Sequence, residues 1–426
     1  MSSVRYTDLS IEQLLACKQD LEQQYAGFAA RNLKLDMSRG KPAGSQLDLT
    51  NAVLDKLDTF KTEAGVDARN YGGLDGIPEA KKLFSELLSI PEEKLIIGGN
   101  SSLNMMYDTI VRFMLFGTCG ATPWCKLPKI KFLCPAPGYD RHFAICEDLG
   151  IEMITIPMHE DGPDMDMVEQ LVANDDSIKG IWCVPLYSNP QGICYSDKVV
   201  ERLASMKAVA DFRIFWDNAY GVHHIYSEEK LADIFAATEK AGNPDRVVYF
   251  FSTSKITFPG AGVALLASSL NNVAEFKKHM TIQTIGPDKL NQLRTVKFLK
   301  NAEGVRAHMR KLADELKPKF DIVLNTLNKE LADTGLATWT NPKGGYFVAI
   351  DTLDNCAKET VRLAKEAGVV MTGAGATFPY KKDPRDRNIR IAPTYPTAAE
   401  LQTAMDLFCI CVKLAGVNQL IAQKKA

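Results

Sequence analysis

The chain of 426 residues is predicted to be an α/β protein: a large domain on a mostly parallel, seven-stranded sheet covered by helices on both faces, plus a smaller α+β domain. Three observations predict this fold. Short apolar runs alternate with helical patterns from about residue 94 to residue 267. The runs are continuous rather than alternating, as strands buried on both faces require. After about residue 285, long helical stretches and three short strands replace that pattern.

Composition excludes several classes of protein. The net charge is −2 and the chain has no long basic block, which gives no electrostatic case for nucleic acid. The ten cysteines form no Cys-x-x-Cys pair and no zinc-type cluster with histidine, so we expect no metal and a reducing compartment. The N-terminus lacks a signal-type apolar core, and no apolar run looks long enough to cross a bilayer. These features predict a cytoplasmic protein without a membrane partner.

The first 47 residues are predicted to form a helix and a segment that joins the small domain. Leucines recur at helical spacing over residues 8–30, and Ser10 with Gln13 resembles a capping box. Residues 35–44 are rich in glycine and proline and are expected to be irregular. This part is too short for a DNA-binding domain.

The large domain is predicted to span residues 48–300. It opens with a glycine-rich loop at residues 70–76 and a helix at 78–88. A short apolar run after Lys94 then enters a turn, Gly98 to Ser102, that leads into a helix at 103–116. Small residues at a helix N-terminus expose backbone N–H groups, which suits an anion such as phosphate.

The alternating pattern then supplies the remaining strands of the sheet. Strands are expected at 131–134, 153–156, 180–184, 212–216, 247–251 and 263–267, and helices at 139–149, 165–173 and 199–210. Ligands of such sheets bind beyond the carboxyl ends of the strands. The residues that follow each strand are therefore the candidates for a site.

The small domain is predicted to span residues 301–426. A helical stretch at 287–330 with a break near Gly304 leads into it. Strands are then expected at 345–350, 369–372 and 388–392, with helices at 357–367 and 397–414.

Polar side chains follow three strands of the predicted sheet. Asn189 follows the strand at 180–184, Asp217 and Tyr220 follow the strand at 212–216, and Lys255 follows Ser252-Thr253-Ser254. Each has a purely structural alternative: a turn for Asn189, a helix N-cap for Asp217, a solvated strand end for Lys255. Desolvation would lower the pKa of the lysine and supply the neutral amine that Schiff-base chemistry requires.

An amide, a carboxylate, a phenol and an amine would thus meet at one edge of the sheet, beside a phosphate-suited turn. A pyridoxal cofactor needs this set: a lysine for its aldehyde, an anion for its ring nitrogen, and donors for its ring oxygen and phosphate.

The order of Asn-Pro-x-Gly, Asp-x-x-Tyr and Ser-x-Ser-Lys resembles that of fold-type I pyridoxal-phosphate aminotransferases, most closely the class Ic bacterial aspartate aminotransferases. The resemblance extends from Ser38 to Pro396. It implies a homodimer with shared sites. It also implies ping-pong transfer of an amino group from an L-amino acid, aspartate or glutamate, to a 2-oxo acid such as 2-oxoglutarate.

The resemblance also implies roles for the cofactor residues. Lys255 would form the Schiff base and shuttle a proton, and Asp217 would pair with the ring nitrogen. Asn189 and Tyr220 would contact the ring oxygen, and Tyr139 would stack on the ring. Residues implied for the phosphate are Asn100, Ser101, Ser102, Ser252, Ser254 and, from the neighbouring subunit, Tyr71.

On the substrate side, Arg390 would bind the α-carboxylate, with Asn189 and the mobile segment around Gly40 close by. Two contacts stay unassigned. Many relatives have a phosphate-binding arginine where this chain has Val263. The distal carboxylate of a substrate has three candidate partners: Arg39, Lys41 and Arg387.

Two other functions stay open. The chain could catalyse another pyridoxal reaction, such as a β-lyase reaction or transamination of aromatic or aminoadipate-type substrates. It could also be a pyridoxal-binding regulatory domain, although such regulators need a DNA-binding module.

Overall fold

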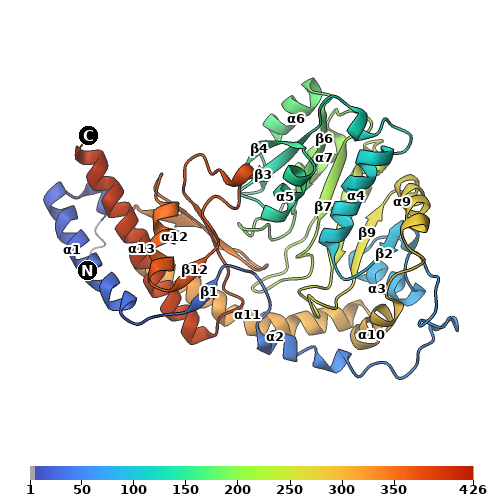
Figure 1. Ribbon diagram of the computed structural model, residues 1–426, viewed down its shortest axis with the longest axis horizontal. Coiled ribbons are helices and arrows are strands. Elements are labelled where there is room, and N and C mark those ends of the chain that lie inside the picture. Colours follow the sequence, from blue (N-terminus) through green and yellow to red (C-terminus); the bar gives the residue numbers. More distant parts are fainter. Residues whose placement is uncertain (1–4, 426) are drawn as a thin grey trace.

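The computed structural model describes residues 5–425, which form two groups of elements that lie side by side with one long helix running along both (Figure 1). The larger group is built on an eight-stranded sheet, and the smaller group has a three-stranded and a two-stranded sheet. The α/β class with a smaller α+β part is confirmed.

The large sheet contains all seven predicted strands and a two-residue strand that extends one edge. In spatial order it consists of β2 (Leu95–Ile97), β9 (Ala264–Ser268), β8 (Val247–Ser252), β7 (Arg213–Asp217), β6 (Ile178–Cys183), β3 (Lys131–Ala136), β4 (Glu152–His159) and β5 (Gly162–Pro163). Strands β4, β3, β6, β7 and β8 are parallel, whereas β9 is antiparallel to both of its neighbours. The parallel strands therefore end at a common edge.

Helices cover both faces of this sheet. They are α3 (Pro78–Leu88), α4 (Ser102–Phe116), α5 (Asp140–Asp148), α6 (Met165–Asn174), α7 (Asp197–Ser205), α8 (Ile234–Lys240), α9 (Leu270–Gln283) and α10 (Lys289–Leu299). Consecutive strand residues point to opposite faces. Ile214 and Trp216 of β7 accordingly pack in one hydrophobic cluster and Phe215 packs in the other. Both faces are buried, which explains the continuous apolar runs.

The smaller group surrounds a second core. Strands β10 (Ala337–Trp339), β11 (Val348–Thr352) and β13 (Asn388–Ile391) form an antiparallel sheet, flanked by α1 (Ile11–Ala29), α12 (Ala357–Glu366) and α13 (Ala398–Lys425). The predicted capping box is present, because Gln13 N–H donates to Ser10 Oγ and Ser10 N–H donates to Gln13 Oε1. Short 3-10 turns lie at Tyr6–Asp8, Asn51–Val53, Glu92–Lys94, Trp124–Lys126, Pro244–Arg246 and Pro379–Lys381.

The segment 35–44, predicted to be irregular, contains a strand. β1 (Leu35–Met37) pairs in parallel with β12 (Val369–Met371), and the short α2 (Gly44–Asp48) follows. Three residues carry too little periodicity to reveal a strand, and only pairing with a distant segment satisfies their backbone groups.

The long helix α11 (Ala302–Leu331) belongs to both groups. Its first turns, with Val305 and Met309, pack in the core of the large group, and its later turns, with Phe320 and Val323, pack in the second core. The break before it lies at residues 300–301 rather than at Gly304, because Asn301 caps the helix by accepting from Gly304 N–H. The division of the chain at residues 47 and 300 stays a prediction.

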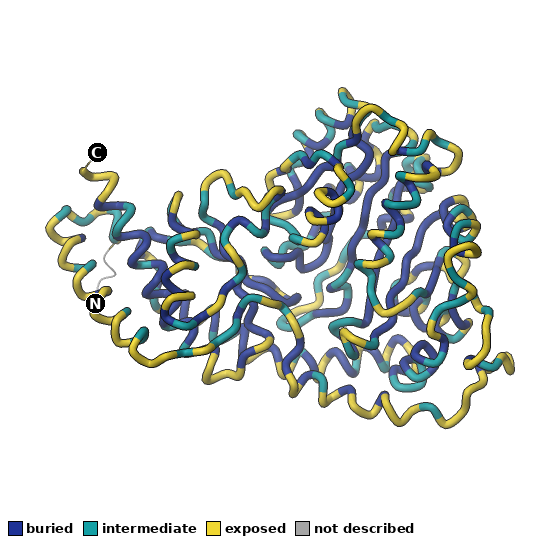
Figure 2. Tube along the Cα trace, in the orientation of Figure 1, coloured by how far each residue is buried: buried dark blue, intermediate teal, exposed yellow. Residues whose placement is uncertain are grey.

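Helix α13 is longer than predicted and corrects the expectation about apolar runs. By length and composition it could cross a membrane, since its most apolar window has a mean hydropathy of 1.5. However, 78% of that window is buried inside the protein, where α1, α11 and α12 pack against it (Figure 2). Burial on most sides removes the amphipathic pattern by which the helix could be traced to its end.

Candidate active site

A cavity of about 210 Å³ lies where β6, β7 and β8 end. It brings together nine of the predicted site residues. They are Ser101, Ser102, Tyr139, Asn189, Asp217, Tyr220, Ser252, Ser254 and Lys255. The apolar part of its wall is formed by Leu103, Met106, Val184 and Ala219. The predicted convergence of an amide, a carboxylate, a phenol and an amine is therefore present in the structure.

Lys255 lies in a turn directly after β8. Its Nζ is 5.1 Å from the centroid of the Tyr220 ring and 5.8 Å from that of Tyr346. Burial lowers the pKa of the Lys255 ammonium, and the positive charge of Arg390 adds to this effect, whereas Asp217 opposes it. A lowered pKa makes the neutral, nucleophilic amine easier to form.

Asp217 is the last residue of β7 and is 3% exposed. Its Oδ2 lies 3.0 Å from Nε2 of His142, which stacks on Trp182 at a centroid distance of 4.1 Å. Its Oδ1 is buried without a hydrogen-bond partner among the described residues. No helix starts after Asp217 in the described chain before α8, so the N-cap alternative is wrong.

A buried carboxylate oxygen without a donor is costly. The protonated ring nitrogen of pyridoxal phosphate is a hydrogen-bond donor with the opposite charge to the carboxylate. The cavity that Asp217 lines also holds the Lys255 amine, which the cofactor aldehyde requires. The residues of the cavity thus fit this cofactor.

His142 was not identified from the sequence. It lies one helical turn after Tyr139, at the start of α5, where its buried ring packs edge-on against that of Tyr139. The i, i+3 spacing from a predicted site residue was the only available signal, and many core histidines share such a spacing.

Asn189 and Tyr220 both line the cavity and can offer hydrogen-bond donors to a ligand. The Asn189 Oδ1 accepts from Arg390 Nη1 at 3.2 Å, which leaves the Nδ2 hydrogens as its donors for a ligand. Burial raises the pKa of the Tyr220 phenol, and the charges of Tyr139 and Asp217 raise it further. Tyr220 therefore keeps its proton and can donate it in a hydrogen bond.

The part of the cavity predicted to bind phosphate combines hydroxyl groups with the N-terminus of α4. Ser101 caps this helix, and Ser102 is its first residue. Ser252 Oγ and Ser254 Oγ lie 3.1 Å apart. Asn100 does not line the cavity, because its side chain donates to the Gly260 carbonyl at 3.2 Å.

Val263, the position of the missing arginine, is 2% exposed and packs in the core of the large group. Its backbone N–H donates to Thr253 Oγ1 at 2.9 Å, which ties it to the turn of Lys255. Tyr71, in contrast, is 80% exposed and lies outside the cavity of its own chain.

Arg390 lies on β13 and is 7% exposed, so it is not a surface ion pair. Its Nη1 donates to Asp140 Oδ1 at 3.0 Å, and its guanidinium carbon lies 4.9 Å from the Phe347 ring centroid. Gly40 also packs against that ring, since a Cβ at Gly40 would lie 2.3 Å from Phe347 Cζ. Asp140 and Phe347 were missed because their roles depend on contacts between distant segments.

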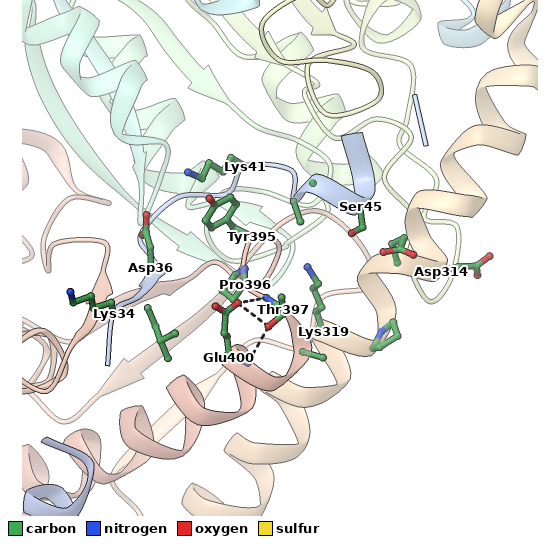
Figure 3. A pocket seen from close by; sticks show the side chains of 16 residues that line it. Lys34, Asp36, Lys41, Ser45, Asp314, Lys319, Tyr395, Pro396, Thr397 and Glu400 are labelled. Carbon is green, nitrogen blue, oxygen red and sulfur yellow. Dashed lines mark hydrogen bonds between the residues drawn. The ribbon is translucent and has the colours of Figure 1, made fainter. Parts of the chain in front are cut away.

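None of the three candidates for a distal carboxylate lines the cavity. Arg387 pairs with Asp354 at 3.8 Å, and Arg39 is exposed. Lys41 lies over the ring of Tyr395, 3.8 Å from its centroid, on the wall of a separate groove of about 930 Å³ between the segment 34–45, α11 and the start of α13 (Figure 3).

We expect His223 to make the protein acid-sensitive. Burial, followed by the charge of Lys255, lowers the pKa of His223 to about 3. In the unfolded chain the His223 imidazole binds a proton near pH 6.5, whereas in the folded protein it does so only near pH 3. The free energy of unfolding therefore keeps its full value above pH 6.5 and decreases as the pH falls toward 3. At pH 5 the loss amounts to about 2 kcal/mol. Urea unfolding of wild type and His223→Leu at pH 7.5 and pH 5 measures it. Equal losses in both proteins would contradict the expectation.

Known proteins are similar to this chain in both sequence and fold. The family model for aspartate aminotransferase matches residues 9–424. The chain is 49% identical over 426 residues to a putative aminotransferase of Mycolicibacterium smegmatis, covering 98% of this chain and 100% of that one. It is 46% identical over 424 residues to an aspartate aminotransferase of Corynebacterium glutamicum, with 98% of each chain covered.

A solved structure extends this similarity to three dimensions. The crystal structure of an aspartate transaminase from Corynebacterium glutamicum superposes with a TM-score of 0.96 at 45% identity, covering 98% of this chain and 100% of that one. The residues matched by the family model include Asn189, Asp217 and Lys255. The chain therefore belongs to the aspartate aminotransferase family and is a transaminase whose cofactor is pyridoxal phosphate.

Proposed function

We propose that the enzyme moves the amino group of L-aspartate or L-glutamate to a 2-oxo acid, with 2-oxoglutarate as acceptor, by a ping-pong mechanism. The observation that carries this proposal is the placement of the Lys255 amine and the unpartnered Asp217 Oδ1 in one cavity. The dicarboxylic substrates are supported by the similarity to the Corynebacterium glutamicum enzyme, which is an aspartate aminotransferase.

Pyridoxal phosphate supplies an aldehyde and an electron-accepting ring when it is bound. Asp217 would hold a proton on the ring nitrogen, and His142 would fix the direction of its carboxylate through the 3.0 Å contact of Nε2 with Oδ2. The Lys255 amine would take the proton from the substrate Cα and carry it during the transfer of the amino group. Tyr220 would donate a hydrogen bond to the ring oxygen, and Tyr139 would cover the ring.

The remaining contacts follow the shape of the cavity. Ser101, Ser102, Ser252 and Ser254 would bind the phosphate with hydroxyl and helix N–H donors. The side chain of Asn100 would support the loop through its hydrogen bond to the Gly260 carbonyl. We infer a homodimer, in which the exposed Tyr71 would reach the phosphate of the second copy. We place it in the cytoplasm, since all ten cysteines are free thiols.

The experiment that tests this function is a donor panel. Purified enzyme with 2-oxoglutarate is offered aspartate, alanine, aminoadipate and aromatic amino acids, and the 2-oxo products are identified. The highest kcat/KM is expected with aspartate. Preference for an aromatic donor, or release of ammonia and pyruvate, would favour the other pyridoxal reactions. Binding to DNA without turnover would favour a regulator.

Replacing Arg390 with lysine should weaken substrate binding while leaving the cofactor in place. Lysine keeps the charge but cannot bind a carboxylate through two parallel N–H groups. We expect kcat/KM for aspartate to fall about 100-fold, which corresponds to the loss of a charged hydrogen bond. The measurement is steady-state kinetics with the visible absorption of the cofactor as a control. An unchanged KM for both substrates would show that Arg390 does not bind the substrate carboxylate.

A further inference from the structure

The turn that carries Lys255 is held by two buried histidines that come from different parts of the chain. His223 follows β7, and its Nε2 lies 3.4 Å from the carbonyl oxygen of Lys255. His308 lies on α11, and its Nε2 is 2.8 Å from the carbonyl oxygen of Ile256. Two consecutive carbonyls of one turn thus each meet an imidazole.

Both imidazoles act as neutral donors. A carbonyl only accepts hydrogen bonds, so Nε2 carries the hydrogen in each ring. Burial lowers the pKa of both histidines, which favours the neutral form. In a neutral ring with hydrogen on Nε2, the Nδ1 is an acceptor. The Nδ1 of His223 is buried and has no donor among the described residues. A hydrocarbon side chain of the same size would avoid the cost of this unpaired nitrogen. His223 therefore contributes to the turn through the hydrogen bond that its Nε2–H donates.

His223 also supports the aromatic surface beneath the lysine amine. Its ring packs edge-on against Tyr220 at a centroid distance of 5.6 Å and against Tyr346 at 5.7 Å. These are the two rings over which Lys255 Nζ lies. One side chain therefore touches the backbone of Lys255 and both rings below its amine.

The two histidines are themselves fixed by other segments. The carbonyl of His223 accepts from Gly345 N–H at 2.8 Å, and a Cβ at Gly344 would lie 2.2 Å from the same oxygen. His308 Nε2 lies 3.2 Å from Thr50 Oγ1, and its ring packs edge-on against Phe298. Rigid support of this kind is what places a reacting group within the narrow range of distances that proton transfer requires.

We propose that His223 and His308 are positioning residues for Lys255: their Nε2–H groups anchor the turn from two sides and set the depth of the amine in the cavity. This inference rests on the proposed role of Lys255 as the covalent anchor and proton shuttle. Neither imidazole lines the cavity, so they act on the reaction through the backbone and the tyrosine rings.

The experiment compares His223→Leu and His308→Leu, which remove the donor, with His223→Gln and His308→Gln, whose amide nitrogen can replace Nε2–H. The matched control is His279→Leu. His279 also contacts an aromatic ring, Phe116, and bonds to a side chain, Glu275, but it lies on α9. The holoenzyme of each variant is measured in two ways besides turnover. One is the pH midpoint of the visible absorption of the cofactor, and the other is hydrogen exchange of a peptide spanning residues 252–258.

We expect each leucine variant to exchange the amides of Ile256 and Thr257 about 3- to 10-fold faster, as the loss of one hydrogen bond gives. The absorption midpoint should shift by about half a pH unit or more, because the amine is displaced in a low-dielectric site. kcat should fall about 10-fold with KM for the amino acid within about twofold, as misplacement of a catalytic group produces. The glutamine variants should recover most of each effect, and His279→Leu should show none.

A purely structural role would lower thermal stability without moving the absorption midpoint or the exchange of this peptide, and that result would overturn the proposal. If a leucine variant does not fold, His223→Asn, whose shorter amide cannot reach the Lys255 carbonyl, is measured in the same way. Failure of the proposed function is distinguishable: it would show as turnover and an unchanged cofactor spectrum in Lys255→Ala, whereas the hydrogen exchange does not depend on that role.

Discussion

Lys255→Ala should abolish transamination. The variant loses the amine that anchors the cofactor and the group that moves the proton at the substrate Cα, and loss of a positioned proton-transfer group alone costs about 10²–10⁴ in rate. We expect kcat to fall at least about 10³-fold. The visible absorption that responds to aspartate in the wild type should also change, because no lysine Schiff base can form. Steady-state kinetics with aspartate and 2-oxoglutarate measure the loss of activity, and absorption spectra measure the loss of the Schiff base.

A matched control for this change is Lys278→Ala, which removes an ammonium whose side chain is 70% exposed on α9. It should keep wild-type kinetics and spectra. Retention of transaminase activity by Lys255→Ala, measured in protein free of wild-type enzyme, would show that the proposed mechanism is wrong.

Asp217→Asn should give the second largest loss. The amide keeps the shape of the side chain but removes the negative charge beside the ring nitrogen. A preorganised charge in a buried site contributes more than it would in water, and loss of one such group costs about 10²–10³ in kcat. We expect a decrease in this range with a smaller change in KM, since the carboxylate acts on the reacting ring rather than on the substrate. Kinetics at several pH values measure the effect.

The control for Asp217→Asn is Asp166→Asn, which removes an exposed carboxylate that pairs with Arg202 on the surface. A surface pair of this kind contributes about 0–1 kcal/mol to stability and should not affect the reaction. Asp217→Glu separates charge from position, because it keeps the carboxylate but must displace the ring of His142. If Asp217→Asn matched the wild type, the fit of the cavity to a pyridinium would be refuted.

The contrast between Asp217 and His142 shows where sequence reasoning ends. Asp217 could be selected because a carboxylate directly after a buried strand needs a partner. His142 lies on an amphipathic helix, and its spacing of three residues from Tyr139 is shared by many core histidines. Only the packing of α5 against the end of β7 brings its Nε2 to 3.0 Å from the carboxylate. The same holds for His223 and His308, whose partners are backbone carbonyls that have no sequence signature.

The fold shows the same division. Seven of the eight strands of the large sheet were found because burial on both faces requires continuous apolar residues, which is a local property. Strand β1 and the full length of α13 were missed. β1 exists because β12 pairs with it, and α13 is apolar on most of its surface because α1, α11 and α12 cover it.

For Lys255, the sequence determined one part of its role and the tertiary structure determined another. The sequence by itself determined that a lysine follows a buried strand, in the order Asn-Pro-x-Gly, Asp-x-x-Tyr and Ser-x-Ser-Lys, and hence which chemistry the chain performs. The tertiary structure decided the rest: which carboxylate oxygen is left without a donor, that Asn100 and Lys41 lie outside the cavity, and which imidazoles hold the turn. The physical reason is that strand and turn patterns depend on neighbouring residues, whereas desolvation and hydrogen bonding depend on segments that meet only when the chain has folded.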